Sequence, residues 1–118
     1  ETERWNLMHP DKKQKKSHLE TSLSKNSVPT VAVSDYVKMV SEQIGPYVPG
    51  PYYALGTDGF GRSETRDALR RFFEVDRYYI VLTAIRALAN ENKIEMEVVE
   101  KVMDKYHLDP EKPNPINV

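Results

Sequence analysis

The spacing of apolar residues predicts a strand followed directly by a helix. Residues 28–33 form a continuous apolar run, which is typical of a parallel strand covered on both faces. Ser34 follows at once as a candidate N-cap of a helix that ends near Gly45-Pro46. This helix would bury one apolar stripe, made of Val37, Val40, Ile44 and Tyr47. A strand leading directly into a capped helix predicts the opening of a βαβ unit.

The rest of the pattern is mostly helical. It predicts a strand at 52–55, a glycine-rich loop at 56–63, and helices over 64–73, from about 76 and over 95–106. Ser63 is the candidate N-cap of the first of these helices, which would bury Leu69, Phe72 and Phe73. The second helix has the clearest 3.6-residue period, on Tyr78, Val81, Leu82, Ile85, Leu88 and Ala89. The proline-containing tail from Asp109 is expected to be irregular.

Residues 1–27 are polar and form a lead-in to a folded part at 28–118. They contain a small apolar cluster around Trp5, a lysine-rich run at 11–16, and a pattern that predicts a short helix over 18–25. The lysine run is either a patch for an anionic partner or, as we favour, a solvated loop. Because two strands alone do not make a stable sheet, we expect an incomplete α/β domain whose other strands lie upstream or come from another chain.

Composition narrows the class of protein. The 118 residues carry a net charge of -1, which argues against a nucleic-acid binder, because neutralising phosphates requires an excess of Lys and Arg. Without Cys, the chain has no disulfide, thiolate zinc site or cysteine nucleophile. It has no apolar run long enough to span a membrane, and it opens on Glu1-Thr2-Glu3-Arg4, which is not a signal peptide. These absences lead us to expect a cytoplasmic protein. The chain also lacks an initiator Met, so we expect it to begin partway through a longer protein.

Candidate catalytic and metal-binding residues are few. His9, His18 and His107 lie far apart and lack the paired spacing of metal ligands, so we expect no metal site. No serine occupies a G-x-S-x-G motif, so we expect no independent nucleophilic catalysis.

A basic and aromatic stretch spans residues 66–79. Arg66, Arg70, Arg71 and Arg77 surround Phe72, Phe73, Tyr78 and Tyr79. Such a mixture can bind nucleic acid, and it is also enriched at protein interfaces. Acidic residues in the same stretch, namely Asp67, Glu74 and Asp76, neutralise much of the positive charge. This balance favours ion pairing or a subunit interface.

The glycine-rich loop is the most unusual feature. Three of the five glycines lie within residues 56–63, which indicates a sharp turn or a close backbone approach. The segment from Gly59 to Ser63 could bind an anion before a helix, although it matches neither the dinucleotide-binding motif nor the P-loop. We favour a structural turn, in which Asp58 and Arg62 could pair and hold its shape.

Several ordered blocks resemble a known family. They are Glu3-Arg4-Trp5-Asn6, His9-Pro10, Ser34-Asp35-Tyr36, Tyr47-Val48-Pro49, residues 55–63, Thr65-Arg66, Leu69-Arg70, residues 73–79 and Asn114-Pro115. Together they resemble the C-terminal domain of the homodimeric, bacterial-type pyruvate dehydrogenases that use thiamine diphosphate, over essentially the whole chain. The resemblance implies a transketolase C-terminal-like α/β domain, a mostly parallel sheet with helices on both faces, whose first strands are missing from this chain.

The resemblance also implies a division of labour. Enzymes of this kind decarboxylate pyruvate and reductively acetylate a lipoyl group on an acyltransferase core. Their thiamine diphosphate, magnesium and catalytic residues belong to upstream domains, so we carry over no catalytic, cofactor or metal-binding residue and expect this chain alone to be inactive. What carries over is a structural and intersubunit loop, made of Gly56, Asp58, Gly59, Phe60, Gly61, Arg62 and Ser63. The alternative is a free-standing module that binds an anion or a nucleotide through this loop.

Overall fold

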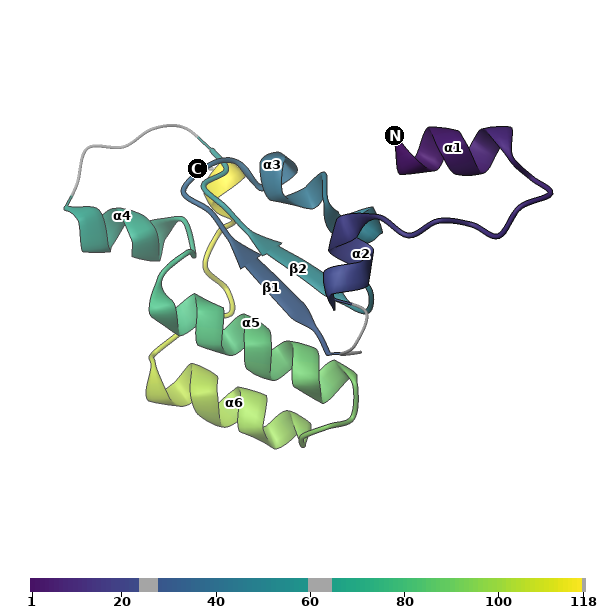
Figure 1. Cartoon of the computed structure of the whole chain (residues 1–118). Coiled ribbons are helices and arrows are strands. Elements are labelled where there is room, and N and C mark those ends of the chain that lie inside the picture. Colours follow the sequence, from purple (N-terminus) through teal and green to yellow (C-terminus); the bar gives the residue numbers. More distant parts are fainter. Residues whose placement is uncertain (24–27, 60–64, 118) are drawn as a thin grey trace.

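A computed structural model describes residues 1–23, 28–59 and 65–117 of the chain (Figure 1). In chain order the elements are α1 (Thr2–Met8), α2 (His18–Leu23), β1 (Thr30–Val33), α3 (Lys38–Glu42), the 3₁₀ turn η1 (Gly45–Tyr47), β2 (Tyr52–Leu55), α4 (Arg66–Phe72), α5 (Arg77–Asn90), α6 (Met96–Lys105) and the 3₁₀ turn η2 (Pro115–Asn117). The predicted strands and the long helices α5 and α6 are confirmed.

The two strands form a parallel pair, as the sequence predicts. Thr30 lies opposite Tyr52 and Val33 opposite Leu55. The segment with α3 and η1 makes the crossover, because parallel strands cannot be joined by a tight turn. The carboxyl ends of both strands point toward the C-terminus of the chain, and α5 packs on β1 and β2 while α6 packs on α5 (Figure 1).

The helix after β1 differs from the prediction. Ser34 is not its N-cap, because Ser34 Oγ accepts the N–H of Tyr36 at 3.0 Å and so closes a local turn. The helix α3 begins only at Lys38 and has no side-chain cap at Val37. Its predicted stripe is not buried either, since Val37, Val40 and Ile44 are 47%, 51% and 45% exposed. Periodicity located the helix, but it does not reveal whether anything covers the apolar face.

The helix α4 begins later than predicted. Ser63 lies outside the described residues, and the N-cap is Thr65, whose side chain accepts the N–H of Ala68. Leu69, Phe72 and Phe73 are half-buried rather than buried, because α4 stands out to one side of the sheet (Figure 1).

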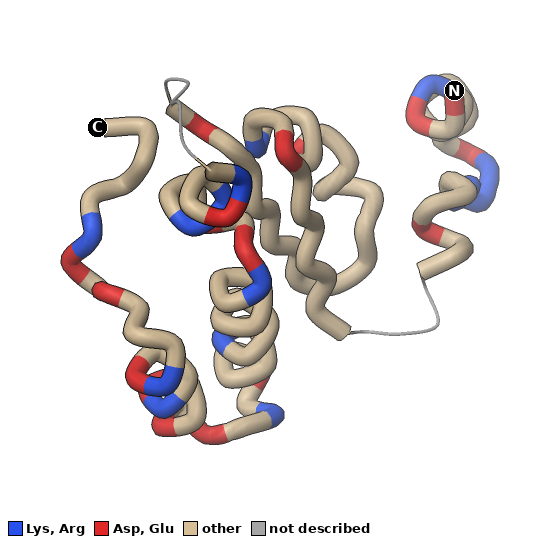
Figure 2. Tube along the Cα trace, turned by 90° about the vertical axis from the view of Figure 1, so that its left-hand side faces the viewer, with Lys and Arg blue, Asp and Glu red and all other residues tan. Residues whose placement is uncertain are grey.

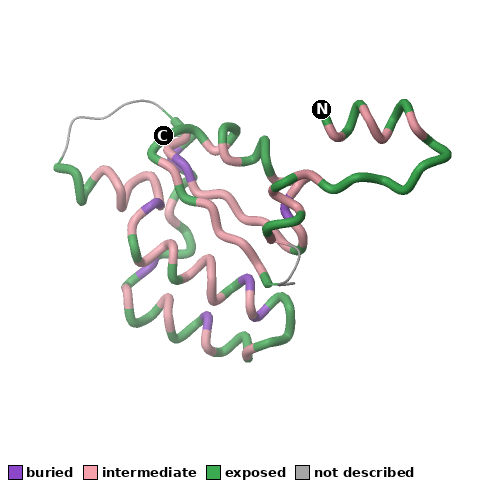
Figure 3. Tube along the Cα trace, viewed as in Figure 1, coloured by how far each residue is buried: buried purple, intermediate pink, exposed green. Residues whose placement is uncertain are grey.

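The core is small and lies mainly around α5 and α6. Its buried apolar residues are Val48, Val75, Ala87, Ala89, Val99 and Leu108, and Figure 3 shows several of them along α5 and α6. Every residue of β1 and β2 is half-buried or exposed, although the continuous apolar run predicted cover on both faces. Helix α5 packs on both strands, α6 packs on α5, and α3 contacts β2, so these helices leave the strands only partly covered.

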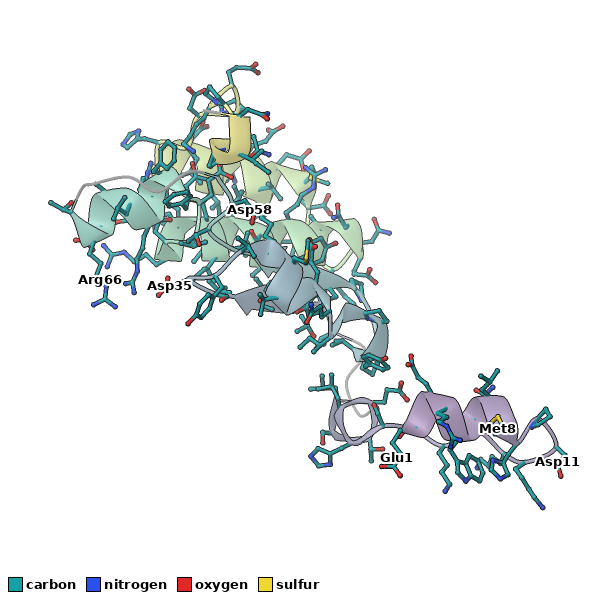
Figure 4. The ribbon with its side chains drawn as sticks, turned by 90° about the horizontal axis from the view of Figure 1, so that it is seen from above. Glu1, Met8, Asp11, Asp35, Asp58 and Arg66 are labelled. Atoms are coloured by element: carbon teal, nitrogen blue, oxygen red, sulfur yellow. The ribbon has the colours of Figure 1, made fainter. Side chains whose placement is uncertain are left out.

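The N-terminal arm, residues 1–17, contains α1, a helix that the sequence pattern did not predict. The Trp5 ring stacks on His9 with centroids 4.4 Å apart, and Lys15 Nζ lies 3.8 Å from the Trp5 ring centroid. Asn6 exchanges two hydrogen bonds with the backbone of Lys15. Figure 4 shows Glu1, Met8 and Asp11 well away from Asp35, Asp58 and Arg66 of the body. Across the described residues, no helix is both long and apolar enough to cross a membrane.

Candidate functional site

The first half of the glycine-rich loop packs closely against the turn after β1. A Cβ on Gly56 would lie 2.6 Å from the carbonyl oxygen of Tyr36 and 2.7 Å from the nitrogen of Lys38, so only glycine allows this approach. The Thr57 N–H donates to the same Tyr36 carbonyl at 2.9 Å, and the Thr57 hydroxyl donates to the Asp35 carbonyl at 2.6 Å. The close backbone approach that the glycine cluster predicts is therefore present at Gly56.

Asp58 supplies the cap that α3 lacks in its own sequence. Asp58 Oδ1 accepts the backbone N–H of Lys38, the first residue of α3, at 2.9 Å. A carboxylate at this position satisfies a free N–H and interacts favourably with the positive end of the helix. The predicted partner of Asp58, Arg62, lies outside the described residues. The contact with Lys38 was missed because the two residues are 20 positions apart.

Gly59 lies against the end of the chain. Its φ is 116°, a conformation that L-residues avoid, and a Cβ there would lie 2.7 Å from the Pro115 carbonyl oxygen. Phe60, Gly61, Arg62 and Ser63, the rest of the predicted loop, lie outside the described residues. The structure thus describes the loop through Gly59 and places it between α3 and the C-terminal tail.

A cavity of about 370 Å³ lies beside the carboxyl ends of the strands, against α4. It is lined by Asp35, Thr57, Gly59, Arg66, Leu69, Arg70, Phe73 and Val75. Figure 4 shows Asp35 and Arg66 near each other on the α4 side, and Arg70 Nη2 lies 4.0 Å from Asp35 Oδ2. Since Asp35 is exposed, this ion pair contributes less than about 1 kcal/mol to stability.

The basic and aromatic stretch is held together by ion pairs and backbone contacts. Figure 2 shows basic and acidic residues close together along α4 and the start of α5. Arg71 Nη1 lies 3.9 Å from Asp76 Oδ2, and Arg71 Nη2 donates to the carbonyls of Tyr106 at 3.1 Å and His107 at 3.3 Å. Arg71 therefore ties α4 to the end of α6. The ion pairing that charge balance favoured is present here.

Two side chains of this stretch have shifted pKa values. A hydrogen bond to the Tyr78 hydroxyl raises the pKa of Arg77, and burial, followed by the negative charge of Glu74, raises the pKa of Tyr79. Both shifts favour the protonated form, which each side chain already has at neutral pH. Neither side chain is thereby prepared as a general base.

The histidines lie on three separate elements. His9 belongs to the N-terminal arm, His18 begins α2, and His107 follows α6. Within residues 1–23, 28–59 and 65–117, no three His, Cys, Asp or Glu side chains gather in a way that could hold a metal ion.

Comparison with known proteins places this arrangement in a family. Residues 5–76 match the family model of the transketolase-like TK C-terminal domain, which covers most of the lead-in, both strands and α4. The chain belongs to this family. The parallel pair β1–β2 with its helices is consistent with an incomplete α/β domain of the transketolase-like type.

The transketolase-like chain also aligns with longer bacterial proteins. It is 51% identical over 118 residues to the pyruvate dehydrogenase E1 component of Cupriavidus necator, covering 100% of this chain and 13% of that protein. It is 50% identical over 116 residues to that of Pseudomonas aeruginosa, covering 98% and 13%. To that of Escherichia coli (strain K12) it is 42% identical over 114 residues, covering 96% and 13%. The chain thus spans about 13% of the length of these relatives.

Proposed function

We propose that this chain is a C-terminal part of a thiamine-dependent pyruvate dehydrogenase and that it serves structure and subunit assembly there. The proposal rests on sequence identity to pyruvate dehydrogenase E1 components, which amounts to about one residue in two over essentially the whole chain. The protein of natural length would decarboxylate pyruvate and acetylate a lipoyl group, in the cytoplasm. Nothing in the comparisons favours a free-standing anion or nucleotide module.

The described residues offer no cluster of acidic ligands for the magnesium ion that accompanies thiamine diphosphate. Magnesium requires several oxygen ligands around one point, and the described residues gather no such acidic group. The lining of the cavity beside α4 includes Arg66 and Arg70 together with apolar side chains. We therefore assign the cofactor and the catalytic steps to other parts of the enzyme, and derive none from these residues.

An assembly role is supported by the apolar face of α3. Val37, Val40 and Ile44, which share one side of this segment at helical spacing, are 45–51% exposed. Exposed apolar groups gathered in one place mark interaction surfaces in proteins. We propose that the remainder of the same enzyme covers this face. The glycine-rich loop would contact the second subunit of a homodimer, and the acyltransferase core would be the further partner.

Activity of two protein forms tests the proposal. The protein of natural length should decarboxylate pyruvate when thiamine diphosphate and magnesium are supplied, and the separate 118-residue chain should not. Turnover by the separate chain would contradict the assignment of catalysis to other parts. Absence of thiamine-dependent turnover in the natural-length protein would contradict the proposed enzyme.

Assembly is tested in the natural-length protein with Val40→Asp, which places a charge on the proposed contact face. We expect weaker association between subunits or domains, measured by sedimentation velocity and thermal melting. Lys101→Ala on α6 alters the net charge equally at an exposed position and serves as the control. Equal behaviour of the two variants would argue against this face as an internal contact.

A further inference from the structure

We infer that the C-terminal segment of the chain holds the first part of the glycine-rich loop, residues 56–59, in place. The C-terminal strap, residues 106–117, leaves α6, crosses the junction between α4 and α5, and returns to the carboxyl ends of the strands (Figure 1). Three contacts hold it, one near each end and one in the middle. This inference does not depend on which enzyme contains the chain.

The first contact fixes the strap where it leaves α6. Arg71 donates to the carbonyls of Tyr106 and His107, and Leu108 next to them is buried. His107 has a φ of 54°, so the backbone turns sharply there. The guanidinium therefore holds the turn that directs the strap toward α4.

The second contact is made by Lys112, in the middle of the strap. Lys112 Nζ lies 2.9 Å from the Phe72 carbonyl oxygen, at the last residue of α4, and 3.0 Å from Glu74 Oε1. The Lys112 and Glu74 side chains are only 25% and 34% exposed, so solvent screens this pair less than a fully exposed one. The ammonium thus satisfies a helix-end carbonyl and pairs with a carboxylate whose residue has a φ of 61°.

The third contact joins the strap to the glycine-rich loop. Pro115 is buried, and its carbonyl oxygen occupies the space that a Cβ on Gly59 would need. The turn η2 around it is closed by Asn114, whose side chain accepts the Ile116 N–H and whose carbonyl accepts the Asn117 N–H. The Gly59 backbone thus lies directly against the buried Pro115, with no room for a side chain between loop and strap.

The strap depends on these contacts for its order. Asp109, Pro110, Glu111, Pro113 and Asn114 are all exposed. Segments with few buried contacts open locally at low free-energy cost. Breaking the Lys112 contact should therefore release the middle of the strap, and with it the support that Pro115 gives to Gly59.

Hydrogen exchange measured by mass spectrometry on the protein of natural length tests the inference. Lys112→Met should raise the exchange rate about tenfold both in the strap and in the segment 56–59. Lys101→Met removes the same charge from an exposed position of α6 and should leave both segments unchanged. Faster exchange in the strap alone, or in neither segment, would overturn the inference.

A second pair of variants tests the same contact by substitutions at glycines, one of them in the loop. Gly59→Ala should detach the strap and raise its exchange, whereas Gly50→Ala should not, although Gly50 also has a positive φ of 81°. Gly50 precedes β2 at the other end of the strand, so the pair separates general backbone strain from loss of the Pro115 contact. Equal strap protection in both variants would overturn the inference. If Lys112→Met unfolds the protein, the exchange rates of the strap in Gly59→Ala and Gly50→Ala still test the inference.

Discussion

At the scale of single residues, Asp58 shows how a loop can complete a distant helix. Its carboxylate caps the first turn of α3, while Thr57 and Gly56 fasten the loop to the turn after β1. The clustering of glycines predicted a close backbone approach, because no other residue type has a comparable role. The partners could not be predicted, since Tyr36 and Lys38 carry no signal that pairs them with residues of the loop.

Asp58→Ala should lower the free energy of unfolding by about 1–2 kcal/mol, because it leaves the Lys38 N–H without its acceptor. Urea denaturation followed by circular dichroism measures the change. Asp104→Ala removes an exposed carboxylate from α6 and serves as the control. Equal denaturation midpoints for the two variants would show that the cap does not stabilise α3.

Arg71 makes contacts that a lysine could not reproduce. Its guanidinium reaches two carbonyls after α6 and the Asp76 carboxylate at once. Arg71→Lys should therefore lower the free energy of unfolding by about 1 kcal/mol or more. Arg86→Lys changes an exposed arginine whose hydrogen bond stays within α5, and it should have little effect in the same denaturation experiment. If the Arg71→Lys variant were as stable as the Arg86→Lys control, this role of the guanidinium would be contradicted.

At the scale of elements, the apolar patterns predicted the strands and α5–α6 but not how well each is covered. The continuous apolar run at residues 28–33 predicts burial on two faces, yet no residue of β1 is fully buried, although α5 packs on both strands and α3 contacts β2. The helix α1 was missed because local contacts of Trp5, His9 and Lys15 hold it rather than a core. The periodicity of apolar residues predicts which side chains could be buried in a core. It does not predict whether other residues are present to bury them.

The N-terminal arm should detach from the body in alkali. A hydrogen bond to the Glu3 carboxylate raises the pKa of Tyr47, so the docked arm favours the neutral hydroxyl. The contact is complete below the normal tyrosine pKa of about 10 and is lost as the pH rises through the raised value. Fluorescence anisotropy of Trp5, the single tryptophan, should fall in this range.

Tyr47→Phe tests this interpretation, because it removes the hydroxyl and keeps the ring. In this variant the arm should already be mobile near neutral pH, so the anisotropy of Trp5 should be low from the start. The anisotropy should then show no further fall from ionisation of Tyr47, although lysine side chains still titrate in this pH range. Tyr36→Phe alters a 72% exposed tyrosine and should keep the alkaline step. An unchanged anisotropy profile in Tyr47→Phe would rule out the Glu3 contact as the anchor of the arm.

At the scale of the whole molecule, the chain is extended for its length. Its radius of gyration is 17.6 Å, with extents of 54 × 36 × 20 Å, whereas a compact domain of this size would have about 13.5 Å. The arm accounts for much of the excess, and the body exposes apolar residues including Val33, Val40 and Val81. Fold class and the parallel pairing followed from the order of elements, whereas this openness could not, because it depends on surfaces that other residues would cover.

The separate 118-residue chain should therefore self-associate in solution. Apolar surface is driven out of water, and faces around Val31, Val33, Val40 and Val81 can be covered only by another copy when nothing else is present. Light scattering should show mass above the 13.6 kDa of one chain, rising with concentration. Val40→Asp should shift the distribution toward monomer more than Lys101→Ala, which alters the net charge equally. A monodisperse monomer with one cooperative melting transition would mean that the described elements bury enough surface on their own, and would count against an incomplete domain.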